Sequence, residues 1–105
     1  MSTQVKNVIL GTGQLGLAIM DELVAAGQPV KMVNRSGNVA ELLPDGVFLE
    51  TADCYDAQAV AQVTAGAETV YFCVQPAYHQ WPEKFPPLAA SIIQGVSDRG
   101  IKLVF

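Results

Sequence analysis

The stretch NVILGTGQLGLAIMDELVAAG, residues 7–27, joins an apolar run to a glycine-rich turn and then to a helical pattern. The run ends at Leu10 and Gly11 interrupts it. Beyond the turn, apolar side chains recur every three or four positions, which predicts a buried strand, a turn and a helix. Gly27 is suited to end that helix, because glycine readily adopts the left-handed conformation. This order is typical of the first unit of a doubly wound α/β domain.

The turn carries the spacing Gly-x-Gly-x-x-Gly, with glycines at positions 11, 13 and 16. The first glycine allows a tight turn, the second leaves space for a diphosphate beside the backbone, and the third lets the helix pack closely on the sheet. Free amides at the helix N-terminus would then face the anion. The pattern predicts that a dinucleotide binds through Gly11, Thr12, Gly13, Gln14, Leu15 and Gly16. A tight turn without a ligand is the alternative.

The rest of the chain alternates between strand-like and helix-like segments. We expect strands at residues 5–10, 29–33, 47–51, 69–74 and 101–105, and helices at 14–26, 57–64 and from 87 to shortly before 100, with a weak helical turn near 39–43. Such alternation requires right-handed parallel crossovers. The sequence therefore predicts a single Rossmann-like α/β domain over residues 1–105. Its doubly wound parallel sheet has five strands in the order 3-2-1-4-5, with helices on both faces.

Composition excludes several other classes of protein. Half of the residues are hydrophobic, 15% are charged, the net charge is -4 and the mean hydropathy is +0.29, as expected for a globular domain whose strands are covered on both faces. The few basic residues are scattered, which argues against nucleic acid or a membrane surface as a partner. No signal peptide or membrane span is recognisable, so we expect a cytoplasmic protein. Cys54 and Cys73 form no Cys-x-x-Cys motif and are expected to be buried thiols, without a metal.

The end of the second strand bears on the choice of cofactor. Sites specific for NAD usually carry an acidic residue there, which binds the ribose 2′-hydroxyl, whereas this chain has Asn34-Arg35-Ser36. Arg35 can pair with a 2′-phosphate and stack on adenine, and Asn34 and Ser36 can donate hydrogen bonds. We therefore expect NADP, with NAD as the alternative. Alternatively, Arg35 is an ordinary solvated loop residue with no role in binding.

The ends of the third and fourth strands complete the predicted site. Asp53 could accept a hydrogen bond from the adenine amino group beside Cys54, or simply shape a turn. Val74, Gln75 and Pro76 should pass under the inner ribose, because ligands of open α/β sheets lie at the carboxyl ends of the strands.

A proline- and aromatic-rich loop at residues 76–86 is expected to overhang the nicotinamide. Tyr78 and His79 lie there without a partner carboxylate, so they are not assigned a catalytic role. Trp81 and Phe85 are expected to pack or to line a substrate pocket.

With these elements placed, the chain resembles the N-terminal part of the atypical and extended short-chain dehydrogenase/reductase superfamily, the NAD-dependent epimerase/dehydratase-like group. The matching segments are residues 9–16, 33–37, 52–53, 70–76 and 102–105. The glycine spacing departs from the TGxxxGxG of the standard enzymes and matches a divergent subset. The resemblance implies an NAD(P)-binding oxidoreductase domain.

In that superfamily a Tyr-x-x-x-Lys pair after the fifth strand donates the proton, and this chain contains no such pair. No catalytic residue is therefore assigned, and whether the chain is an enzyme stays open. We expect the cofactor-binding part of a longer oxidoreductase that would supply the small-molecule substrate site. A non-catalytic NAD(P)-sensing regulatory module is the alternative. The apolar last strand is a candidate surface for forming a homodimer, because its outer edge would be unpaired.

Overall fold

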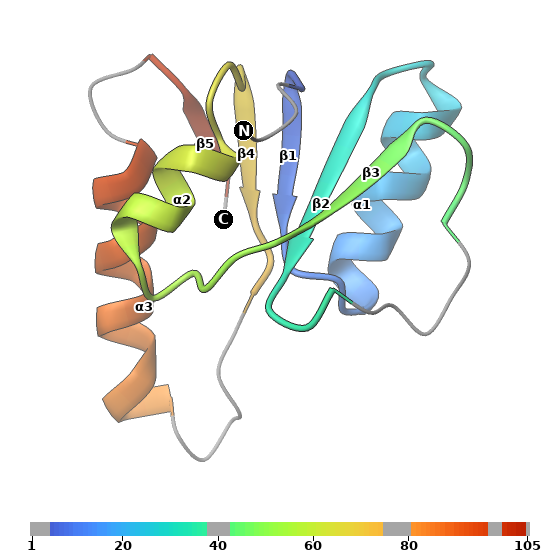
Figure 1. Ribbon diagram of the computed structural model, residues 1–105. Helices are drawn as coiled ribbons and strands as arrows, with labels where there is room; N and C mark the ends of the chain where they lie inside the picture. Colours follow the sequence, from blue (N-terminus) through green and yellow to red (C-terminus); the bar gives the residue numbers. More distant parts are fainter. Residues whose placement is uncertain (1–4, 38–42, 75–80, 97–99, 105) are drawn as a thin grey trace.

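Within the part of the chain that the structure describes, five parallel strands form one sheet in the order β3-β2-β1-β4-β5 (Figure 1). The structure is a computed structural model and describes residues 5–37, 43–74, 81–96 and 100–104. Its elements are β1 (Asn7–Leu10), α1 (Gln14–Ala25), β2 (Val30–Asn34), β3 (Val47–Thr51), α2 (Ala57–Val63), β4 (Thr69–Phe72), α3 (Trp81–Val96) and β5 (Lys102–Val104). This topology confirms the predicted Rossmann-like α/β fold.

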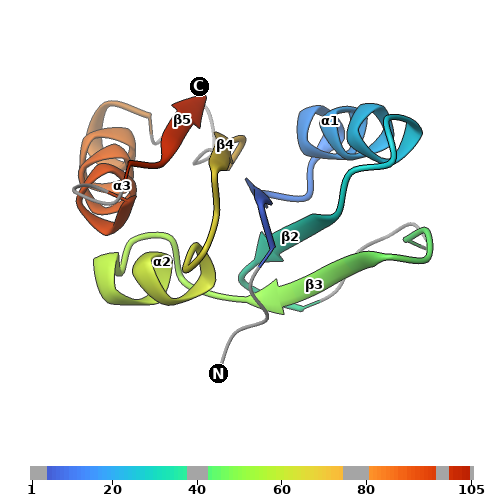
Figure 2. The ribbon, with the colours of Figure 1, turned by 90° about the horizontal axis from the view of Figure 1, so that it is seen from above.

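Helices cover both faces of the sheet, as Figure 2 shows from above. On one face α1 packs on β1 and β2, and its core contains Ile9, Met20, Val30 and Met32. On the other face α2 and α3 pack on a larger cluster that includes Val8, Leu10, Val60, Val70, Phe72, Leu88 and Ile92. Neighbouring residues of β1 and β4 thus point to opposite faces, and both sets are apolar apart from Asn7 and Thr69 at the strand starts. The prediction of strands buried on both sides is confirmed for β1, all four residues of which are buried.

Local sequence explains the start of α2 and its close contact with α3. Asp56 is the N-cap, and its carboxylate accepts a hydrogen bond from the backbone amide of Gln58 at 3.0 Å, as is typical of an aspartate at this position. A Cβ at Gly95 would lie 2.7 Å from the Val60 side chain and 2.8 Å from the Ala57 carbonyl. The absence of a side chain at position 95 therefore allows the two helices to approach each other.

The start of the last helix was predicted wrongly. The sequence placed it at Pro87, but α3 begins at Trp81 and contains Pro86 and Pro87. Proline inside a helix removes a backbone donor and favours a break. Here the apolar stripe continues N-terminally through Phe85, whose ring packs on Phe72 at a centroid distance of 5.9 Å, and this packing favours the helix although Pro86 and Pro87 remove two donors. Residues 81–86 are thus helical and do not form a loop, whereas residues 75–80, 38–42 and 97–99 lie outside the described part.

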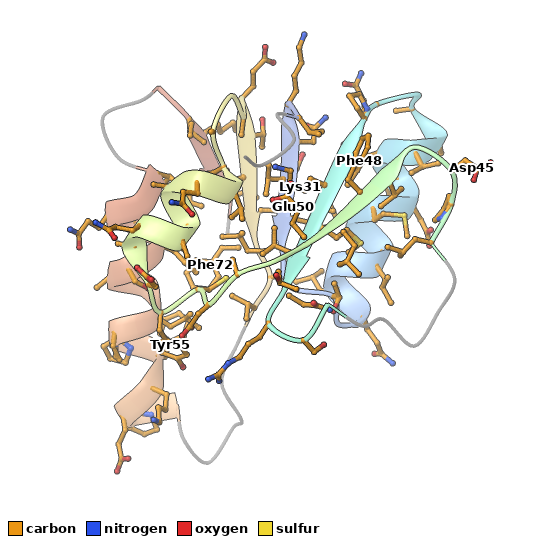
Figure 3. The ribbon with its side chains drawn as sticks, in the orientation of Figure 1. Lys31, Asp45, Phe48, Glu50, Tyr55 and Phe72 are labelled. Atoms are coloured by element: carbon orange, nitrogen blue, oxygen red, sulfur yellow. The ribbon has the colours of Figure 1, made fainter. Side chains whose placement is uncertain are left out.

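A charged side chain lies in the core between β2 and α2. Lys31 is fully buried, and its Nζ is 3.2 Å from Oε1 of Glu50 on β3. The same ammonium group donates a hydrogen bond to the carbonyl oxygen of Val63 at 3.0 Å. That carbonyl ends α2, where the helix dipole favours a cation. Lys31 therefore joins two strands and a helix, and Figure 3 shows it pointing toward Glu50.

None of the helices in the described ranges combines the length and the apolar character that crossing a bilayer requires.

Candidate functional site

A cavity of about 220 Å³ lies at the carboxyl ends of the strands, where the loops after β1, β2, β3 and β4 meet. Its lining residues are Gly11, Thr12, Val33, Asn34, Arg35, Ala52, Asp53, Cys54, Tyr55, Val74 and Leu88. Val33 and Leu88 are buried and form an apolar floor. Thr12, Asn34 and Arg35 supply polar groups at the rim. An apolar floor with a polar rim is typical of a site for a small organic ligand.

The glycine loop has the geometry that its spacing predicted. Gly11 has a φ of +118°, and a Cβ there would lie 2.8 Å from the Val74 backbone nitrogen. Gly16 has no room for a side chain either, because the Gly11 carbonyl lies against it. A Cβ at Gly13 would meet open space. The first glycine thus lets β1 pass close to the end of β4, the third lets α1 pack on the turn, and the second leaves its surroundings clear.

The N-terminus of α1 faces the same end of the sheet. Gly13 is its N-cap and supplies no side-chain hydrogen bond, and the first turn has no acidic residue. The first backbone bond runs from the Leu17 amide to the Gly13 carbonyl at 2.9 Å, so the amides of residues 14–16 precede the intrahelical ladder. Gln14 and Leu15 are exposed. They stand at the helix start and do not line the cavity.

Hydrogen bonds tie the glycine loop to the end of β2. The Asn34 side-chain nitrogen donates to Thr12 Oγ1 at 3.0 Å, and Asn34 Oδ1 accepts from the Gly37 amide at 2.7 Å. Asn34 therefore fixes the relative positions of the two loops. Arg35 lies between these contacts in the sequence, is exposed and lines the cavity. Ser36 is also exposed but is not among the lining residues.

The loop after β3 is held by hydrogen bonds of its own. Asp53 Oδ1 accepts from the Tyr55 amide at 2.9 Å, and the Asp53 carbonyl accepts from the Asp56 amide at 2.9 Å. The Ser91 hydroxyl of α3 donates to the Cys54 carbonyl. Asp53 thus shapes this turn, one of the two roles that the sequence allowed. Tyr55 lines the cavity although sequence reasoning did not select it. Tyr55 could have been selected from the sequence, because it lies only two residues after Asp53, which was already assigned to the site.

Two cysteines lie close to the site as free thiols. Burial, followed by the negative charge of Asp53, raises the pKa of Cys54 to about 11. Burial also raises the pKa of Cys73. Both side chains therefore stay protonated at neutral pH and are poor nucleophiles there. The prediction of a buried thiol is confirmed for Cys54, whereas Cys73 is only partly buried.

The structure brings together seven of the predicted residues around one cavity: Gly11, Thr12, Asn34, Arg35, Asp53, Cys54 and Val74. Gly13 and Gly16 lie beside them in the loop. Gln75, Pro76, Tyr78 and His79 lie outside the described residues. Phe85 was expected either to pack or to line a substrate pocket, and it packs against the core.

Comparisons with known proteins identify the fold. No family model matches the sequence, and a search of curated proteins gave no match. Among solved structures, a Rossmann-fold NAD(P)-binding family protein from Shigella flexneri superposes with a TM-score of 0.77 at 19% identity, over 97% of this chain and 51% of that one. A proposed epimerase from Bacteroides thetaiotaomicron superposes with a TM-score of 0.73 at 26% identity, over 93% of this chain and 44% of that one.

Uronate dehydrogenase from Agrobacterium tumefaciens, solved in complex with NAD, gives a TM-score of 0.65 at 15% identity, over 89% of this chain and 36% of that one. The structural neighbours also include a short-chain dehydrogenase/reductase and a proposed NAD-dependent epimerase/dehydratase. The chain thus has the Rossmann-like fold of these proteins. It spans about half, or less, of their length.

Proposed function

We propose that the chain binds NADP(H) at the carboxyl ends of its strands, as the cofactor-binding domain of an oxidoreductase related to the short-chain dehydrogenases/reductases. The observation that carries the proposal is a cavity lined both by the glycine loop and by Arg35. In this proposal the diphosphate lies at residues 11–16, where the amides of α1 and the positive end of its dipole favour an anion.

The 2′-phosphate of the adenosine lies beside Arg35. A guanidinium group can hold a phosphate through two parallel hydrogen bonds, and β2 ends without the carboxylate that would repel it. Asn34 acts mainly on the loop, because its amide already holds Thr12 and Gly37. Ser36 is the further candidate donor to the phosphate. Cys54, Val74, Gln75 and Pro76 are proposed to border the adenine and the inner ribose.

Calorimetric titration with NADPH and NADH tests this assignment. The chain should bind NADPH more tightly, and Arg35→Ala should weaken NADPH binding by about 1.5–3 kcal/mol with little change for NADH. Lys6→Ala is the matched control, because it removes one positive charge from an exposed position just before β1, at the opposite end of the sheet. A general electrostatic effect would weaken NADPH binding equally in both variants.

The titrations distinguish the preference for NADP over NAD from dinucleotide binding itself. Equal affinities, or tighter binding of NADH, would make the NADP assignment wrong while leaving dinucleotide binding intact. An absence of binding for both cofactors would make the proposed function wrong. Binding of a dinucleotide would be consistent with an enzyme domain and equally with a nucleotide sensor.

A further inference from the structure

We infer that the ring of Tyr55 forms a stacking wall for the adenine base at this site. The inference rests on the proposed function and names a side chain that contacts the ligand. Tyr55 is 40% exposed and lines the cavity, together with Arg35 from the end of the neighbouring strand. A large aromatic side chain left open to solvent beside an apolar floor is suited to pack against a flat base.

The backbone around Tyr55 is held before any ligand arrives. Its own amide donates to Asp53 Oδ1, the following amide donates to the Asp53 carbonyl, and the preceding carbonyl accepts the Ser91 hydroxyl from α3. These three bonds tie the loop both to itself and to a helix of the core. Because the backbone is already ordered, binding a base against the ring requires little further loss of entropy.

The cavity has the composition that a purine requires. Leu88 and Val33 are almost fully buried and offer an apolar floor, while Arg35 can stack on the opposite face of a base through its planar guanidinium. Phosphates need neither feature. The tyrosine therefore adds affinity for the base, and the glycine loop and Arg35 add affinity for the phosphates.

Phe48 provides a matched control for an exposed ring. It is 43% exposed, close to the value for Tyr55, but it lies on β3 away from the cavity. Figure 3 shows the two rings on opposite sides of the molecule. Phe48→Ala removes a comparable exposed ring without changing the proposed site.

Binding of adenosine 2′,5′-bisphosphate to the whole chain tests the inference. Tyr55→Ala should weaken binding about tenfold, Tyr55→Phe should bind as the unchanged chain does, and Phe48→Ala should have no effect. The adenine absorbance band of the bound ligand should also lose intensity with the unchanged chain and with Tyr55→Phe, because stacked chromophores absorb less strongly. The Tyr55→Ala complex should lack this loss.

Each outcome decides one question. If the unchanged chain binds neither NADPH nor the bisphosphate, the proposed function and this inference are both wrong. If it binds them but the absorbance band is unchanged, or Tyr55→Ala binds equally well, only the stacking role is wrong. An equal loss in Tyr55→Phe and Tyr55→Ala would assign the effect to the hydroxyl and would likewise overturn the inference.

Discussion

Replacing Lys31 by methionine should destabilise the protein far more than removing a surface lysine. Methionine keeps most of the aliphatic volume but removes the ammonium group that contacts Glu50 Oε1 at 3.2 Å and the Val63 carbonyl at 3.0 Å. Both partners lose a charged donor. The carbonyl at the end of α2 is then left without the cation that stabilises the helix terminus.

The expected magnitude follows from burial. Breaking a buried ion pair from one side costs about 3–5 kcal/mol. The Glu50 side chain is 22% exposed, so water can partly replace its lost partner, and we expect a loss of about 2–4 kcal/mol. The total stability of a domain of this size is about 5–15 kcal/mol, so the variant should still fold. The double variant Lys31→Met with Glu50→Gln should lose less than the sum of the single losses by about 1 kcal/mol or more.

Urea unfolding, followed by circular dichroism, measures these free energies. Lys6→Met is the matched control, because Lys6 pairs with Glu68 at 3.8 Å while both side chains are well exposed, and such pairs contribute at most about 1 kcal/mol. Added salt should hardly change the effect of Lys31→Met, since buried pairs are little screened. A loss no larger than that of the control, or additive losses in the double variant, would refute the assigned role.

Three further predictions concern packing, reactivity and association. Gly95→Ala should cost about 1–3 kcal/mol in urea unfolding because its methyl group would push α2 and α3 apart; an unchanged midpoint would contradict this contact. In a variant whose only cysteine is Cys54, iodoacetamide should react slowly at neutral pH and faster as the pH rises toward about 11, the raised pKa; equal rates in folded and urea-unfolded protein would contradict burial. Light scattering should detect dimers joined at β5, and Leu103→Pro should favour monomers. The Lys102 amide donates to the Glu68 carbonyl just before β4, so the next amide, that of Leu103, faces outward. Monomers alone at micromolar protein would disprove that surface.

Much of the architecture was determined by local sequence. The apolar run ending at Leu10, the glycine spacing and the helical pattern after it specify a strand, a turn and a helix through short-range effects: burial periodicity and the conformational freedom of glycine. The same holds for the Asp56 cap. Alternating elements and right-handed crossovers then left few topologies, so the strand order was predictable. The loops at the strand ends could therefore be assigned to one site before their contacts were known.

Only the tertiary structure decided which side chains meet across the sheet. Phe85 packs on Phe72 and extends α3 past two prolines, a long-range contact that overrides the local preference to break a helix. Lysine is usually an exposed residue. The burial of Lys31 depends on Glu50 and on the end of α2, which are distant in sequence. Tyr55 becomes part of the cavity because Ser91 holds its loop against α3. Local pattern fixes the elements, whereas partners far apart in the chain fix the environment of each side chain.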